Sequence, residues 1–477
     1  MTDTIMRRKM SRRDMLVLAS KSVALLGFGS VAAACQVVVP AAQAPAAAEG
    51  EQKAAGAPSQ AEVTIEFITP GALGLERTMY ENFILKFEAE ENPAVDVNVT
   101  FEAWGDYMTK LPTILAGGII PDMIHQHMSI VQEYAYRGAL LELNDLMERD
   151  GVRPEDYIPA LFDAFSHKGK TYGIPKDSAA WGMYFNKTMF DEAGLDYPDE
   201  KWTMEDFQTL ALELTRDQNG YPASDPNFDA ENIKQWGMAW RDPTAANGED
   251  SRGFVRAFGG EWYSEDYKET LLTDQPAMDV FNLFHQMRCI EGSIPAASQA
   301  LGQGDPFRAG LTAMQVSFHI GTFFAKQENV QFDYDVRFLP AGPGGQYSVV
   351  GCSGWAIPAQ ATHKEEAWQL VKYLTSLPVQ TYIGEQKRWG VSLKEAVSTI
   401  EPDDGYPENF AKVHTDPFKG TVDVEVISLK FPPQQSRIRE IYAAEFDPIW
   451  TCTSDDVEAA ATNTKQQVDQ LLAELNW

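Results

Sequence analysis

Short strand patterns alternate with amphipathic helix patterns near the start of the folded part of this sequence, and this alternation limits the fold more than any other feature. The expected strands lie at residues 63–67, 95–101 and 121–124, and the expected helices at residues 76–90 and 107–115. Apolar side chains alternate with polar ones in the first two strands, and recur every three or four residues in the helices. This order predicts an α/β lobe with a largely parallel sheet.

The carboxyl ends of the expected strands mark a possible ligand site, because ligands of such sheets bind beyond those ends. Residues 69–74 and 125–129 would lie at this rim. His125 and His127 would share one face of an extended segment. That arrangement is compatible with hydrogen bonds to a ligand or with a metal, but the spacing offers no third metal ligand, and no metal is expected.

The N-terminus has the layout of a secretory signal. Residues 6–13 are cationic, residues 15–34 are mostly apolar, and three alanines precede Cys35. Polar residues interrupt the apolar stretch, so it would be a poor membrane-spanning helix. Residues 11–13 resemble a twin-arginine export signal, although the sequence that follows departs from that pattern. Residues 1–34 are therefore predicted to be a signal peptide, and the export route is left open.

Cys35 lies in a sequence that resembles a lipoprotein box. Acyl chains on Cys35 would hold the mature chain at the outer face of the cell membrane. Residues 35–60 are rich in Ala, Pro, Gln and Gly, so we expect a flexible tether. The alternative is plain cleavage near Ala34, which would release the protein to the periplasm or the medium.

Length, charge and cysteine content further limit the possible architecture, partners and disulfides of the protein. A chain of 477 residues favours two lobes over one core. The 69 acidic residues against 39 basic ones argue against a nucleic-acid partner. If Cys35 carries lipid, then Cys289, Cys352 and Cys452 remain, and they allow at most one internal disulfide. The sequence does not choose the pair.

No known catalytic motif stands out. The sequence has no nucleophile elbow, phosphate-binding loop, zinc-protease motif or dinucleotide fingerprint. The glycine-rich residues 341–345 lack the Lys and the Ser or Thr that a phosphate cradle needs. No cofactor and no enzymatic activity are expected.

Several segments together resemble a known family. They are residues 86–93, residues 111–122, the run Gly169-Lys170-Thr171-Tyr172-Gly173-Ile174-Pro175, residues 184–195, residues 202–207, residues 307–314, and the run Gly351-Cys352-Ser353-Gly354-Trp355-Ala356-Ile357-Pro358. Each segment is weak alone, but their order and spacing are similar to those of the extracellular solute-binding proteins of ABC importers, specifically the sugar-binding family 1 of lipoprotein type. Asp122, in the second segment, is expected mainly to accept hydrogen bonds from backbone N–H groups.

The resemblance implies an α/β, two-lobed, periplasmic-binding-protein-like fold of type II, with a hinge and a ligand cleft between the lobes. The first lobe would comprise residues 61–176 and 349–378, and the second residues 177–348 and 379–477. A ligand would be captured by closure about the hinge and then delivered to a permease.

Candidate ligand residues follow from the chemistry of sugars, which present an apolar face and a rim of hydroxyl groups. Aromatic rings cover the face, while charged or amide groups pair with the rim. The candidates are Trp355, Trp240, Arg241, Trp262, Asp177, Trp181, Phe318, His319, His125, His127, Arg388 and Trp389. Trp104, Trp202 and Trp368 are instead expected to pack in the core or at helix starts.

The expected function is capture of a sugar or oligosaccharide by a monomeric binding lipoprotein, with ABC permease subunits as partners and no nucleic acid. Two alternatives stay open. One is the same fold binding a glycerophosphate, a polyamine or a peptide, and the other is a secreted carbohydrate-active enzyme. The sequence does not identify the solute, its length, its affinity or the permease.

Overall fold

The described residues exclude the N-terminus and several loops. The computed structural model describes residues 61–71, 74–117, 120–239, 251–296, 305–318, 330–386, 390–400 and 406–475. The predictions on the signal peptide, the tether and six side chains lie outside them; these side chains are Cys35, Trp240, Arg241, His319, Arg388 and Trp389.

The first lobe is built on a five-stranded mixed sheet. Its strands lie in the order β2 (Val95–Glu102), β1 (Val63–Pro70), β3 (Met123–His127), β13 (Ser353–Ala356) and β6 (Ile174–Pro175). β1 is parallel to both of its neighbours, whereas β13 is antiparallel to β3 and β6. The predicted parallel pairing of the first three strands is therefore confirmed, and the rest of the sheet is antiparallel.

Alternation along the strands explains the first core. Ile65, Phe67, Val95 and Val97 are buried, while the residues between them are more exposed. Gly354 allows β6 to approach β13, because a Cβ atom there would lie only 2.6 Å from the carbonyl oxygen of Ile174.

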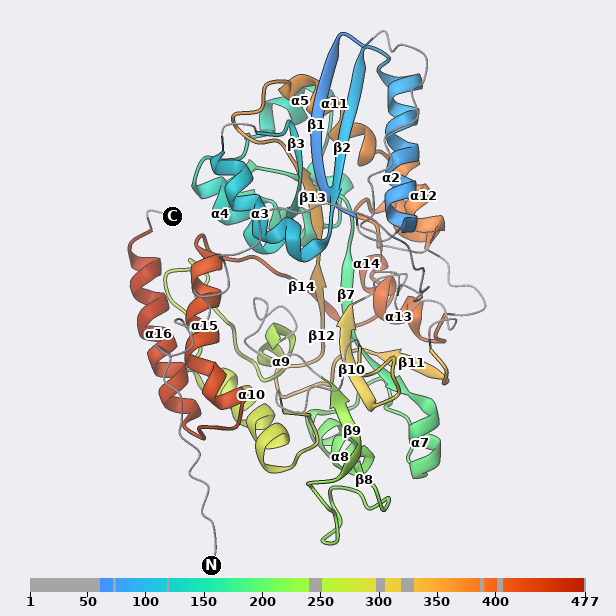
Figure 1. Cartoon of the computed structure of the whole chain (residues 1–477), viewed down its shortest axis with the longest axis vertical. Coiled ribbons are helices and arrows are strands. Elements are labelled where there is room, and N and C mark those ends of the chain that lie inside the picture. Colours follow the sequence, from blue (N-terminus) through green and yellow to red (C-terminus); the bar gives the residue numbers. More distant parts are fainter. Residues whose placement is uncertain are drawn as a thin grey trace, which may run out of the picture. The chain divides into compact units, whose positions relative to one another are not determined.

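Helices surround the first sheet at the top of Figure 1. They are α2 (Gly74–Lys86), α3 (Trp104–Ala116), α4 (Met128–Tyr136), α5 (Asn144–Asp150), α6 (Pro159–Ala164), α11 (Lys364–Leu374) and α12 (Leu377–Glu385). α2 and α3 confirm the two helices predicted from apolar spacing. Asp122 also behaves as predicted, because its Oδ1 accepts hydrogen bonds from the backbone N–H groups of Thr362 and His363, at 2.9 and 2.8 Å.

The second lobe contains a seven-stranded sheet. Six strands follow the order β14 (Glu425–Ser428), β12 (Tyr347–Gly351), β7 (Ala179–Asn186), β10 (Thr312–Phe318), β9 (Ile233–Ala239) and β8 (Arg216–Asp217), and β11 (Tyr334–Arg337) pairs with β7 beside them. β10 is antiparallel to β7 and parallel to β9, and β12 is parallel to β14 and antiparallel to β7. The two sheets confirm the two-lobed α/β class (Figure 1).

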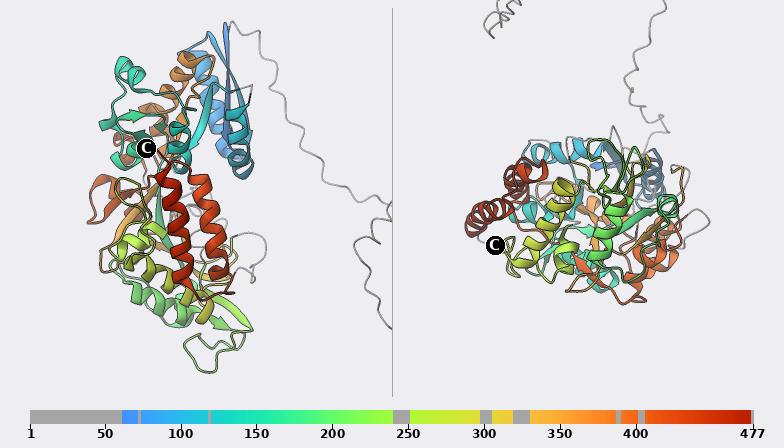
Figure 2. Two further views of the ribbon diagram at one scale, coloured as in Figure 1. Left: turned by 90° about the vertical axis from the view of Figure 1, so that its left-hand side faces the viewer. Right: turned by 90° about the horizontal axis from the view of Figure 1, so that it is seen from below.

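The second lobe has helices of its own. They are α7 (Lys187–Ala193), α8 (Met204–Leu214), α9 (Ser251–Ala257), α10 (Gln275–His285), α13 (Phe410–His414), α14 (Asp416–Lys419), α15 (Gln435–Trp450) and α16 (Val457–Ala473). α15 and α16 run side by side (Figure 2, left). The buried residues Val457, Ala461, Val468 and Leu472 fix the packed face of α16.

Two short described segments pass between the sheets, and a longer stretch that is only partly described leads from β13 to β14. Residues 176–178 join β6 of the first sheet to β7 of the second, and Cys352 joins β12 of the second sheet to β13 of the first. We call residues 176–178 and 351–353 the crossing segments. The detailed lobe boundaries given above stay a prediction. None of the helices in the described part of the chain is both long and apolar enough to span a membrane.

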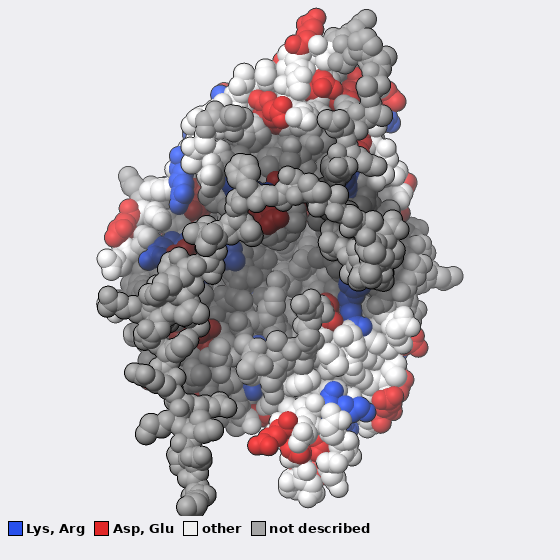
Figure 3. Space-filling view, viewed as in Figure 1, with Lys and Arg blue, Asp and Glu red and all other residues white. Residues whose placement is uncertain are grey.

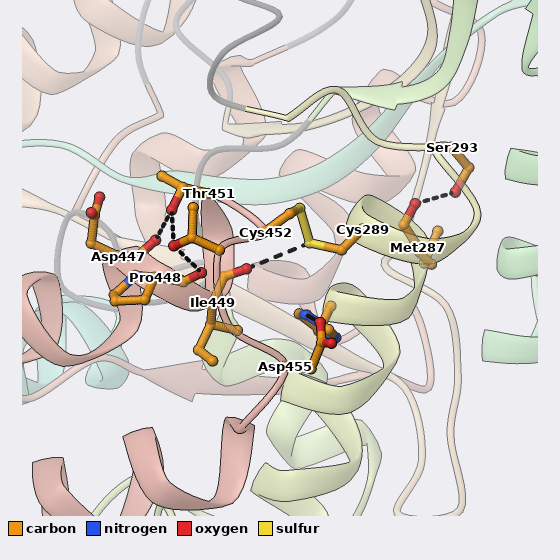
Figure 4. The surroundings of a disulfide bond; sticks show 11 residues. Met287, Cys289, Ser293, Asp447, Pro448, Ile449, Thr451, Cys452 and Asp455 are labelled. Atoms are coloured by element: carbon orange, nitrogen blue, oxygen red, sulfur yellow. Dashed lines mark hydrogen bonds and ion pairs between the residues drawn. A yellow bond between two sulfur atoms is a disulfide. The ribbon is translucent and has the colours of Figure 1, made fainter. Parts of the chain in front are cut away.

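A disulfide joins Cys289 to Cys452, with the Cα atoms 5.4 Å apart (Figure 4). Cys289 lies in the short π-helix that follows α10, and Cys452 lies just after α15. The bond answers the pairing question that the sequence left open, and Cys352 is buried and takes no part in the disulfide.

Loss of this disulfide should destabilise the protein, because the bond closes a sequence separation of 163 residues. We expect Cys452→Ser to lower the free energy of unfolding by about 2–5 kcal/mol, measured by urea denaturation of the oxidised protein. Cys352→Ser serves as the control for thiol loss without loss of the bond. Equal stability of Cys452→Ser and the unaltered protein would contradict this expectation.

Candidate functional site

The carboxyl ends of strands from both sheets lie beside the crossing segments. In the first sheet, His127 at the end of β3 pairs with Ser353. In the second sheet, Gly351 at the end of β12 pairs with Ala179, and Phe318 at the end of β10 pairs with Trp181. Because ligands of α/β sheets bind at such ends, the boundary between the lobes is the candidate site.

Trp104 forms the exposed part of the first sheet's rim. It follows β2 directly and begins α3, and its side chain is 47% exposed. Its ring centroid lies 5.6 Å from that of His125 and 5.4 Å from that of His127, with the rings nearly perpendicular. The two histidines thus share a face of β3, as predicted, and support a tryptophan ring that is open to solvent.

The two histidines have different surroundings. His127 Nδ1 lies 2.7 Å from Ser129 Oγ and accepts from the Ser129 backbone N–H, so it caps α4. His125 is buried, neither of its ring nitrogens has a hydrogen-bond partner within the described ranges, and burial holds its pKa well below the usual value. Among the described residues, no cluster of three or more His, Cys, Asp or Glu side chains is placed to hold a metal.

Trp355 lies beneath this rim rather than on it. Its side chain is fully buried, and its ring makes edge contacts with the rings of Phe67, Tyr80 and His125 at centroid distances of 5.2, 5.4 and 5.7 Å. Trp355 therefore belongs to the core of the first lobe in this structure, and it reaches the rim through His125.

A buried ion pair occupies the first crossing segment. Lys176 Nζ lies 2.6 Å from Asp177 Oδ2, and over the rings of Trp355 and Tyr80 at 5.2 and 5.6 Å. Asp177 Oδ1 accepts a hydrogen bond of 2.6 Å from the backbone N–H of Ser353 in the other crossing segment. Burial is the largest single influence and would lower the pKa of Lys176, but Asp177, Tyr80 and Glu76 together outweigh it and raise that pKa well above its usual value.

Gln380 ties a third segment to the crossing. Its side-chain amide donates to the carbonyl oxygen of Lys176 at 2.8 Å and accepts from the backbone N–H of Ser392 at 2.8 Å. The Ser392 hydroxyl in turn donates to the carbonyl oxygen of Pro175 at 2.7 Å. All of these groups are buried, so the hydrogen bonds act in a low-dielectric environment where losing a partner is costly.

The second sheet contributes a smaller aromatic pair. The rings of Trp181 and Phe318 lie 4.7 Å apart between centroids, at the ends of β7 and β10 beside the crossing segments. Trp181 is buried, its indole N–H has no partner in the part of the chain that the structure describes, and Phe318 is half-buried. Trp262 is elsewhere: it is buried and donates to the Tyr442 hydroxyl at 2.8 Å, next to Phe281 of α10.

The structure therefore brings some of the predicted site residues together and separates others. His125, His127, Trp355 and Asp177 form one connected group, Trp181 and Phe318 form a second, and Trp262 joins neither.

Sequence reasoning assigned Trp104 to packing and did not select Lys176 or Gln380. Trp202 and Trp368 are buried with hydrogen-bonded indoles, as expected, whereas almost half of Trp104 is exposed. The position of Trp104 at the carboxyl end of a strand was the available signal.

Charged side chains do not gather in one patch on the described part of the face drawn in Figure 3. Acidic and basic side chains are interspersed there.

Comparisons with known proteins agree on one family. Residues 74–381 match the family model described as bacterial extracellular solute-binding protein. A binding protein of Brucella abortus is 24% identical over 308 residues, which cover 62% of this chain and 68% of the relative.

Solved structures share the fold. An ABC substrate-binding protein of Listeria monocytogenes in complex with cycloalternan has a TM-score of 0.72 and 23% identity, over 86% of this chain and 99% of that one. An ABC transporter solute-binding protein of Thermotoga lettingae bound to α-D-tagatose has a TM-score of 0.71 and 20% identity, over 86% of this chain and 100% of that one.

The positions of Trp355 and Trp104 predict very different losses of stability when each is replaced by alanine. We expect Trp355→Ala to lower the free energy of unfolding by about 3–5 kcal/mol, because it opens a cavity in a packed core. Trp104→Ala should change it by less than about 1 kcal/mol, since the ring is half exposed. Urea denaturation of both variants checks this, and equal losses would show that the two rings are not differently buried.

Proposed function

This chain belongs to the bacterial extracellular solute-binding proteins, and from that premise we propose that it captures a sugar or oligosaccharide between its lobes and delivers it to an ABC permease. The proposal includes no chemical change of the solute, because the family consists of binding proteins.

The exposed ring of Trp104 is the observation that most supports a sugar as the solute. It lies at the carboxyl edge of the first sheet and is supported by His125 and His127. A tryptophan face can cover the apolar C–H face of a pyranose, and nearby polar groups can bind its hydroxyls. The sugars bound by the Listeria and Thermotoga proteins support the same class.

Closure would follow from contacts on both lobes. A solute resting on Trp104 in the first lobe would meet the ends of β7 and β10, near Trp181 and Phe318, in the second. A ligand shifts the equilibrium toward the closed form only by the difference in its affinity for the two forms. Contacts to both lobes provide that difference, since they are complete only when the lobes are closed.

We place the protein outside the cell membrane, as the family implies, with residues 1–34 as a signal peptide and a lipid on Cys35. The disulfide between Cys289 and Cys452 supports an oxidising compartment. A tether of residues 35–60 would keep the receptor near its permease and so raise the effective concentration. We expect a monomer that binds no nucleic acid.

Thermal denaturation against a panel of mono- and oligosaccharides tests the proposal. A bound sugar should raise the melting temperature by mass action, and Trp104→Ala should reduce its affinity by about tenfold or more. Tyr221→Ala is the matched control, because Tyr221 is also an exposed aromatic residue (42%) but lies on a loop of the second lobe beside β8.

A clear shift with another class of solute and with no sugar would refute the sugar assignment. Equal affinity of the Trp104→Ala and Tyr221→Ala variants would instead remove Trp104 from the site.

A further inference from the structure

A cavity of about 510 Å³ lies in the second lobe, next to its boundary with the first. Residues from α9, from the loop after it and from β14 line it, among them Arg252, Tyr263, Ser264, Tyr267, Glu425 and Ser428. Its volume lies within the range of small-molecule sites.

Arg252 is a buried cation without a carboxylate partner in the part of the chain that the structure describes. Its side chain lines the cavity, yet the residue is only 8% exposed. One guanidinium nitrogen, Nη1, donates to the carbonyl oxygen of Lys430 at 2.8 Å, whereas Nε and Nη2 have no hydrogen-bond partner among the described residues. The guanidinium group lies over the rings of Phe431 and Tyr263, at 4.5 and 5.2 Å. These rings offset part of the cost of burying the charge, but they leave two N–H donor positions unused.

The other charged residues of the cavity are arranged differently. Arg256 forms ion pairs with Glu261 and, at 3.5 Å, with Glu425, so its charge is compensated. The side chains of these two glutamates are 49% and 64% exposed, and Glu265 is exposed too. Water and salt screen these exposed carboxylates, whereas the charge of Arg252 is screened much less. The deep part of the cavity is therefore the favourable place for a negative group.

The cavity lies beside α6, the helix that follows the first three strands of the first sheet. Ser428, which lines it, donates through Oγ to the carbonyl oxygen of Ala160 in α6 at 2.7 Å. Lys430, whose carbonyl oxygen binds Arg252, also places its Nζ 3.3 Å from Asp163 in the same helix. α6 packs against β6 of the first sheet and against β12 and β14 of the second, so it lies at the boundary between the two sheets.

We propose that this cavity receives an anionic group of the solute, a carboxylate or a phosphate, and that Arg252 determines this specificity. A planar carboxylate or a phosphate oxygen pair matches the unused N–H donors of a guanidinium group. The inference rests on the proposed function and narrows the solute to an acidic sugar, either a uronate or a sugar phosphate.

The test compares acidic sugars with their neutral parents on the full-length protein by calorimetric titration and thermal denaturation. The pairs are glucuronate with glucose, galacturonate with galactose, and glucose 6-phosphate with glucose, at neutral pH. We expect at least one acidic member to bind about 10- to 100-fold more tightly than its parent. The uronate and phosphate arms distinguish the two sources of negative charge.

Three variants assign the preference to Arg252. Arg252→Met removes the charge but keeps an apolar side chain of similar length, and it should abolish the preference. Arg252→Lys should restore part of it. Arg216→Met removes the same charge from β8 at the far edge of the second sheet, and it should leave the preference unchanged. If Arg252→Met does not fold, the comparison of acidic and neutral sugars on the unaltered protein still tests whether the protein prefers an acidic sugar.

Three results would overturn the inference. They are the absence of any preference for an acidic sugar, a preference that survives in Arg252→Met, and binding of inorganic phosphate as tight as that of glucose 6-phosphate. Neutral sugars that stabilise all variants equally would refute the acidic subsite and leave the proposed function intact.

Discussion

The buried ion pair between Lys176 and Asp177 is the interaction on which the rest of the structure depends. Asp177 neutralises the lysine and also holds the backbone N–H of Ser353, so one carboxylate joins both crossing segments. Lys176 lies over Trp355 and Tyr80 in the core of the first lobe, and its carbonyl oxygen binds Gln380. Loss of one partner would leave the other charge buried and unpaired, which is costlier than the gain from the pair itself.

This connection places the functional edges of the two sheets. Since the strands change sheet at residues 176–178 and 351–353, the carboxyl ends of β3, β10 and β12 all lie beside the crossing. The strand ends at which ligands of α/β sheets bind therefore lie together at one boundary between the lobes. Short crossing segments between two sheets are also what hinge closure needs, because a few residues there can absorb the change while the lobes move as units.

The sequence predicted the features that depend on local periodicity, and missed those that depend on distant neighbours. Alternation predicted β1 and β2, and apolar spacing predicted α2 and α3. Local periodicity could not distinguish Trp355 in the core from Trp104 on the rim, because the exposure of a side chain depends on strands far away in the sequence. The partner of Cys289 and the lack of a counter-ion for Arg252 are equally non-local, and no pattern near either residue indicates them.

The central claim is that the two lobes close on a solute about the crossing segments. Small-angle X-ray scattering of the protein, with and without a saturating concentration of a sugar that stabilises it, tests this claim most directly. Closure predicts a smaller radius of gyration when the solute is bound. An unchanged radius of gyration at saturation would contradict the account, because the solute would then bind without bringing the lobes together.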